Sequence, residues 1–176
     1  MELDNQLFQI RTKKQLDKHL THWKQHPQET PIGYILSLEG ADSIVNMDYL
    51  HQMYREGLRA IGPAHYGPGT YAFGTDSTGG IGLKGKSLLK EISELKLILD
   101  ATHLCDQSFW ETLEIYDGPI WASHSNVRKW VPDERQFDDD QIKALIERDA
   151  VIGMAFDAWM MLPNWKRGIT DPYKSG

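Results

Sequence analysis

The sequence predicts an α/β protein with a parallel sheet of about five strands joined by crossover helices. The first reason is the order of segments, because helical patterns alternate with short apolar runs from residue 12 to residue 156 and no hairpin signal interrupts them. The second reason is that the apolar runs are continuous rather than alternating, as in strands that are covered on both faces.

In the first half of the chain the pattern is helix, strand, helix, strand. A helix is expected over residues 12–26, where apolar residues recur on one face and Pro27 ends it. The apolar run 32–38 has the length of a strand. A second helical pattern stops at Gly57, a residue type common just after helices, and residues 58–61 follow as a short strand.

In the second half the alternation continues after a long loop. This loop covers residues 66–82 and is rich in glycine, and loops of such length in a compact domain are usually functional or mobile. Asp106 is expected to be a helix N-cap, and the acidic triplet 138–140 is expected to complement a helix dipole. The expected elements are, in order, a helix over 83–95, a strand over 96–99, a helix from Asp106, a strand over 119–122, a loop over 125–137, a helix from the triplet, a strand over 150–156 and an irregular tail over 157–176.

Composition indicates a globular protein with neither nucleic acid nor membrane as its main partner. The chain has 176 residues, enough for one domain with a core, and a net charge of −6, which disfavours binding to polyanions. No apolar run approaches the roughly 18 residues of a membrane span. The first residues lack the features of a signal peptide, so the expected location is the cytoplasm.

Polar residues able to do chemistry follow all five predicted strands. They are Glu39, His65, His103, His124 and Asp157. The carboxyl ends of parallel strands meet at one edge, which in a (β/α)8 barrel is where active sites lie. Because a glutamate and two histidines are typical ligands of zinc, the sequence predicts a metal site at Glu39, His103 and His124. The alternative is that each histidine is a buried, hydrogen-bonded side chain.

Several residues near these strand ends have more than one interpretation. Asp100 either orients the imidazole of a metal ligand or caps a turn, and the sequence leaves both open. Cys105 is expected to be a small buried residue rather than a thiolate ligand. Ser123 and Ser125 lack a Gly-x-Ser-x-Gly motif, so neither is expected to be a nucleophile. Residue type and position alone favour a surface location for Arg135, with carboxylate binding as the alternative.

Several motifs together resemble the membrane dipeptidase (renal dipeptidase) family of zinc peptidases. The motifs are Glu-Gly-Ala-Asp-Ser within residues 38–44, Ile-Gly-Pro-Ala-His within 57–65, Asp-Ala-Thr-His within 100–106, Ala-Ser-His-Ser-Asn at 122–126 and Val-Ile-Gly-Met at 151–154. Their order and spacing match the family from about residue 32 to about residue 156. The resemblance implies a single domain that is the central part of a (β/α)8 barrel, two zinc ions in a complete enzyme, and dipeptides as substrates.

The resemblance also implies roles for five residues. Glu39 matches the carboxylate that bridges both ions, and His103 and His124 match the two histidines on the second ion. His65 matches the histidine that contacts the substrate and stabilises the tetrahedral intermediate. Arg135 matches the arginine that binds the C-terminal carboxylate of the substrate, so the resemblance favours a place in the site over a place at the surface.

The sequence departs from the family in two features. It contains no His-x-Asp pair, which binds the first ion in the family, and no last-strand Gly-Ser/Thr-Asp-Phe-Asp-Gly type of motif, whose aspartate shuttles a proton. We therefore expect at most one complete ion site and hydrolysis far below that of a complete enzyme. The alternatives are an inactive partial-site metal-binding protein and another metal-dependent barrel amidohydrolase. Because an open parallel sheet exposes two edges, we also expect a second copy or a complementary chain to cover them.

Overall fold

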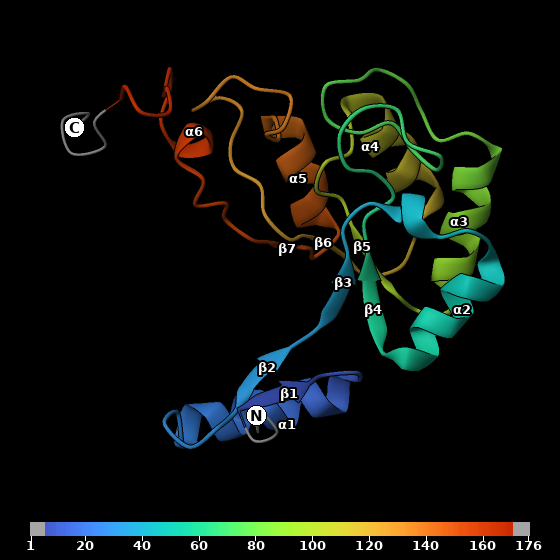
Figure 1. Ribbon diagram of the computed structural model, residues 1–176, viewed down its shortest axis with the longest axis vertical. Coiled ribbons are helices and arrows are strands. Elements are labelled where there is room, and N and C mark those ends of the chain that lie inside the picture. The colour runs from blue at the N-terminus through green and yellow to red at the C-terminus, as the bar shows by residue number, and fades with distance from the viewer. Residues whose placement is uncertain (1–5, 171–176) are drawn as a thin grey trace.

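A five-stranded parallel sheet dominates the computed structural model, which describes residues 6–170 (Figure 1). Its strands are β3 (Leu36–Leu38), β4 (Leu58–Ile61), β5 (Ile98–Asp100), β6 (Ile120–Ala122) and β7 (Val151–Ile152). Their order in the sheet is their order in the chain, and each neighbouring pair is parallel. Successive βα units of a (β/α)8 barrel have this arrangement, so the predicted fold class, a partial barrel, is confirmed.

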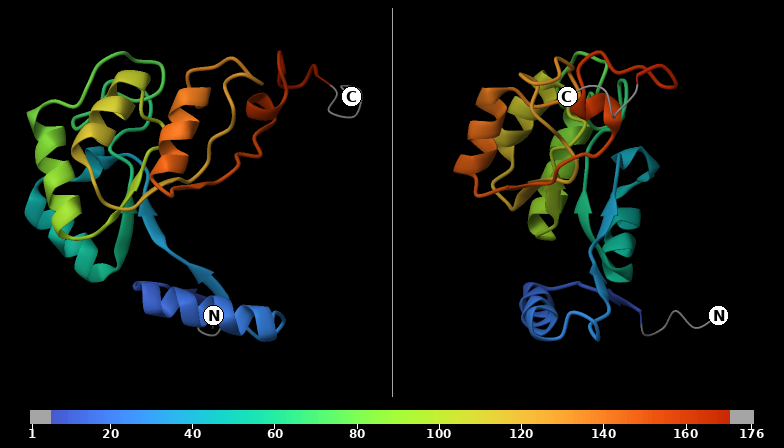
Figure 2. Two further views of the ribbon diagram at one scale, coloured as in Figure 1. Left: turned by 180° about the vertical axis from the view of Figure 1, so that it is seen from behind. Right: turned by 90° about the vertical axis from the view of Figure 1, so that its left-hand side faces the viewer.

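Four helices connect these strands and lie on one side of the sheet (Figures 1 and 2). They are α2 (Met47–Glu56), α3 (Leu83–Glu94), α4 (Asp106–Ile115) and α5 (Asp139–Glu147). Apolar side chains from helices and strands form one buried cluster, which includes Leu50, Leu58, Ile61, Leu88, Leu89, Ile92, Leu99, Phe109, Ile120 and Leu145. Within the described range no helix is long and apolar enough to cross a membrane.

The helix ends follow local sequence signals. The Asn46 side chain accepts a hydrogen bond from the amide of Tyr49 at the start of α2, and Gly57 ends that helix with a φ of 119°. Asp138 forms a capping box with Gln141 at the start of α5, as the acidic triplet predicted. The expectation that Asp106 is an N-cap is wrong by one residue, because it is the first residue of α4 instead. A short 3-10 helix (Ala41–Ser43) follows β3.

The amino-terminal segment differs from its prediction in two respects. The apolar run 32–38 forms two strands, β2 (Ile32–Tyr34) and β3, because its first half pairs with an unpredicted strand, β1 (Leu7–Gln9), and its second half pairs with β4. The helix α1 (Lys13–Gln25) begins after the Thr12 cap, as expected. Together β1, α1 and β2 lie beyond the amino ends of the main sheet's strands (Figure 1).

The carboxyl-terminal segment also differs from its prediction. Strand β7 is shorter than the apolar run 150–156, and beyond it the Asn126 side chain bonds both backbone groups of Ala155. A short helix, α6 (Ala158–Met161), interrupts the segment expected to be an irregular tail. That part of the expectation is therefore wrong, and residues 171–176 lie outside the described range.

Candidate metal centre

Four of the predicted site residues meet at the carboxyl edge of the sheet. Glu39 directly follows β3, while His65, His103 and His124 lie in the turns after β4, β5 and β6. The ligand atoms of Glu39, His103 and His124 all lie within 4.8 Å of one another. Each of the two histidines places Nε2 at 3.0 Å from Oε1 of Glu39. The structure thus assembles the predicted ligand group, and metal binding by it remains a prediction.

The backbone at His103 is strained in a way that favours a functional explanation. Its φ is 70°, in the left-handed region that residues with a β-carbon adopt at a cost. The residue is buried at the end of β5. Such strain persists only where the surrounding structure holds it, and here it accompanies an imidazole that faces Glu39.

The hydrogen bonds around His103 leave its Nε2 suited to a cation. The hydroxyl of Thr75 donates to the carbonyl oxygen of His103 at 3.4 Å and lies 3.1 Å from its Nδ1. In the tautomer with its proton on Nδ1, His103 donates to this hydroxyl and turns the lone pair of Nε2 toward Oε1 of Glu39, 3.0 Å away. In that tautomer both facing atoms are acceptors, the arrangement that holds a metal ion. The residues present therefore fit a divalent ion.

A hydroxyl group also orients His124. Of the two interpretations of Asp100, its hydrogen bonds support the one in which it caps a turn. Oγ of Ser123 lies 2.8 Å from Nδ1 of His124 and so holds this imidazole in its orientation. Asp100 instead accepts the backbone amides of Thr102 at 3.1 Å and Ser123 at 3.0 Å. Asp100 therefore holds the turns after β5 and β6 together, while hydroxyl groups orient the two imidazoles.

Replacing Asp100 by alanine is expected to destabilise the fold by about 3 kcal/mol, because two backbone amides lose their acceptor beside a buried side chain. Asp100→Asn keeps a carbonyl oxygen at the same position and is expected to lose less than half as much. Urea unfolding of both variants measures the difference. An asparagine variant as unstable as the alanine variant would show that the paired turns do not depend on this acceptor.

The electrostatic surroundings keep His103 neutral. Burial, the nearby positive charge of Arg135 and the neighbouring imidazoles of His65 and His124 together lower the pKa of His103 to about 3, and burial is the largest of these causes. A neutral imidazole at physiological pH is the form that binds a metal ion. Burial thus gives His103 the protonation state that the predicted role requires.

Arg135 is buried beside this group, so the surface location favoured by residue type alone is wrong. Its side chain is 4% exposed, and it donates to the hydroxyl of Ser125 at 3.0 Å and to the carbonyl oxygen of His124 at 2.7 Å. Burial lowers the pKa of Arg135, while Tyr66 and Glu39 oppose this shift by favouring the cation. The resemblance placed this arginine correctly beside the site, and its contact with a substrate remains a prediction.

His65 and Tyr66 form the exposed side of the group. Nε2 of His65 lies 3.8 Å from Oε1 of Glu39, farther than the other two imidazoles, and half of its side chain is accessible. The Tyr66 ring packs against His65 and His103, with centroid distances of 5.0 and 5.1 Å. Burial raises the pKa of Tyr66, and Arg135 counteracts this shift. Beyond its being an aromatic residue in a long loop, Tyr66 has no sequence signal that marks it as a site residue.

Two other candidates lie outside the ligand group among the described residues. Cys105 donates its thiol to the carbonyl oxygen of Gly79 at 3.1 Å and is buried, as expected for a small core residue. Asp157 precedes α6 as its N-cap residue and does not join the group. The site is therefore built by the ends of β3 to β6, not by the segment after β7.

Comparison with known proteins agrees with this geometry. The family described as membrane dipeptidase (peptidase family M19) matches residues 6–172. An uncharacterised protein of Acinetobacter calcoaceticus is 31% identical over 148 residues, which cover 79% of this chain and 47% of that protein. The chain thus spans about half the length of this curated relative.

Solved structures show the same relationship. The chain superimposes with a TM-score of 0.82 on a metallopeptidase described as dipeptidase AC, at 25% identity, covering 98% of this chain and 52% of the other. A metallopeptidase from Rhodobacter sphaeroides, liganded with a phosphinate mimic of the dipeptide L-Ala-D-Ala, has a TM-score of 0.77 at 26% identity, covering 89% of this chain and 45% of the other. With the family match spanning nearly all of its length, the chain belongs to the membrane dipeptidase family, peptidase family M19.

Proposed function

We propose that this chain supplies the second-ion half of a two-metal dipeptidase site that hydrolyses dipeptides with a metal-activated water. The main support is the convergence of Glu39, His103 and His124 beside a buried arginine, in a chain of this family. Zinc is the proposed ion, because two imidazoles and one carboxylate are a ligand set of catalytic zinc sites.

Each residue has a proposed task that follows from its position. Bound zinc supplies a Lewis acid that lowers the pKa of water enough for attack on a peptide carbonyl near neutral pH. His65, with its half-exposed side chain, donates a hydrogen bond to the carbonyl oxygen as negative charge develops there. Arg135 uses two N–H groups within the protein, and its remaining donors bind the C-terminal carboxylate of the substrate.

The first-ion ligands are proposed to come from another segment or another chain. The sequence contains no His-x-Asp pair for the first ion, so its ligands are proposed to come from outside these 176 residues. A segment or chain that pairs with β3 or β7 would supply these ligands and cover an open edge of the five-stranded sheet. A second copy of this chain would cover the edge without supplying a His-x-Asp pair.

The second candidate function is metal binding without hydrolysis. It is favoured by one observation: the group of Glu39, His103 and His124 is complete within this chain, whereas the sequence has no first-ion pair. Such a protein would bind one zinc ion and leave dipeptides intact.

Zinc titration followed by a hydrolysis assay separates these candidates. We expect one zinc ion per chain and slow, zinc-dependent cleavage of alanyl-alanine, with no cleavage of its C-terminal amide or of a cyclic amide such as dihydrouracil. Zinc binding without cleavage, even at protein concentrations equal to substrate, would favour the second candidate. Cleavage of the cyclic amide alone would indicate a different amidohydrolase, and failure to bind zinc would overturn both candidates.

A further inference from the structure

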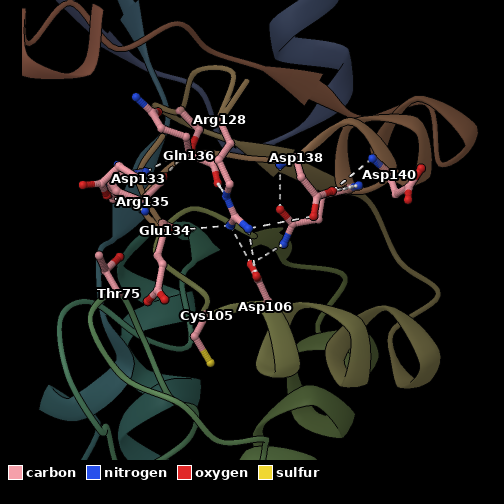
Figure 3. Close-up of polar contacts among 12 residues, drawn as sticks. Thr75, Cys105, Asp106, Arg128, Asp133, Glu134, Arg135, Gln136, Asp138 and Asp140 are labelled. Carbon is pink, nitrogen blue, oxygen red and sulfur yellow. Dashed lines mark hydrogen bonds and ion pairs between the residues drawn. The ribbon is translucent and has the colours of Figure 1, made fainter. Parts of the chain in front are cut away.

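The loop that carries Arg135 is held by another arginine, Arg128 (Figure 3). The Arg128 guanidinium donates from Nε to the carbonyl oxygen of Gln136 at 3.0 Å and from Nη2 to that of Glu134 at 3.4 Å. These two carbonyl groups belong to the residues immediately before and after Arg135. Arg128 therefore fixes the backbone on both sides of the residue proposed to bind the substrate carboxylate.

The same guanidinium joins this loop to the segment that carries a metal ligand. Arg128 binds Asp106 in a bidentate pair, with Nη1–Oδ2 and Nη2–Oδ1 distances of 2.8 and 2.6 Å. Asp106 is the first residue of α4 and lies in the same short segment as His103. Gln141 of α5 donates to Asp106 at 3.0 Å and holds the carboxylate in place. Because two parallel N–H donors bind one carboxylate, the pair restricts the orientation of the Arg128 guanidinium as well as its distance from Asp106.

We propose that Arg128, held by Asp106, is a positioning residue that sets the location of Arg135 relative to the metal ligands. The consequence is selectivity for substrates with a free C-terminal carboxylate. The inference rests on the proposed function, because it assumes that Arg135 binds this carboxylate. Among the described residues, Arg128 forms no hydrogen bond or ion pair with the predicted ligands, so its effect passes through the loop backbone.

Loss of Arg128 is expected to change the position of Arg135 rather than the charge near the substrate. Arg135 has little freedom to adjust, because its own guanidinium is buried against Ser125 and the His124 carbonyl. A shift of about 1 Å in the backbone at Arg135 would misalign its remaining donors, and misplacement of this size can reduce function by about a hundredfold. Zinc binding should be unaffected, since Glu39 and the two imidazoles keep their own contacts.

The test compares binding of alanyl-alanine and of its C-terminal amide to the zinc-loaded chain by NMR titration. In Arg128→Met we expect the preference for the free carboxylate to fall at least tenfold, with unchanged zinc affinity. Asp106→Asn should show a similar loss, and the double variant should lose no more than the larger single effect, because both residues act through one contact. Lys143→Met removes another surface ion pair, Lys143–Asp140, and is the matched control.

The outcomes separate this inference from the proposed function. An unchanged carboxylate preference in Arg128→Met, with a clear preference in the unmodified chain, would overturn the positioning role and leave the dipeptidase proposal intact. A lowered melting temperature with an unchanged preference would assign Arg128 to stability alone. If the unmodified chain itself shows no preference for the free carboxylate, the role of Arg135 fails first, and the inference fails with it.

Discussion

His103→Gln is expected to lower the zinc affinity of the chain by at least about a hundredfold. The loss of a second-shell partner alone typically costs ten- to a hundredfold, and this change removes a ligand. Glutamine keeps a polar side chain of similar size at this buried position, although its amide is a poor zinc ligand. Isothermal titration calorimetry with zinc, or the visible spectrum with cobalt, measures the change.

The chain contains a matched control for this prediction. His51 and Glu91 form another histidine–glutamate pair, with a distance of 2.9 Å between Nε2 and Oε2, on the helices α2 and α3. His51→Gln removes an imidazole beside a carboxylate without touching the predicted ligand group, so zinc affinity should stay within about twofold of the original. Equal losses in the two variants would show that zinc does not bind at Glu39, His103 and His124.

Arg135→Met is expected to weaken alanyl-alanine binding by about a hundredfold while leaving zinc affinity nearly unchanged. Hydrogen bonds to a charged group contribute about 1.5–3 kcal/mol each, and each 1.4 kcal/mol corresponds to a tenfold change in affinity. Methionine fills much of the volume of the buried arginine side chain but provides no donor. NMR titration with the dipeptide and with its C-terminal amide measures the loss.

The amide separates a specific effect from a general disturbance of the site. It lacks the carboxylate, so its weaker binding should change by less than about threefold in Arg135→Met. Arg135→Lys keeps the charge without the planar fork and should recover part of the dipeptide affinity but little of the preference. A parallel loss of zinc affinity would contradict the carboxylate role and indicate that Arg135 mainly supports His124 through its carbonyl oxygen.

The sequence predicted most of the main sheet because its signals are local. Continuous apolar runs marked β4, β5 and β6 within about two residues, and Gly57 and the acidic triplet marked the ends of helices. The alternation of helix and strand then specified a parallel order, which places Glu39, His103 and His124 at one edge. Residue type and position alone indicate these three candidates, independently of the family resemblance.

The predictions were wrong where contacts between residues distant in sequence determine the structure more than the local residue pattern does. The run 32–38 has no break in its apolar pattern, but it forms two strands because its halves pair with different strands. The three residues of β1 are too short for a periodic signal, and β7 covers only Val151–Ile152, beyond which the Asn126 side chain bonds the backbone of Ala155. The buried location of Arg135 had no local signal, because the residues that surround it come from separate loops.

By itself the sequence determined the fold class, the family and the identity of the candidate metal ligands, since each depends on residue types and their order along the chain. Only the tertiary structure decided how these ligands are held. Thr75 reaches His103 from the glycine-rich loop, Asp100 joins two turns, and Arg128 links Asp106 to the backbone around Arg135. Such contacts join residues distant in sequence through hydrogen bonds whose geometry exists only once the strands have paired.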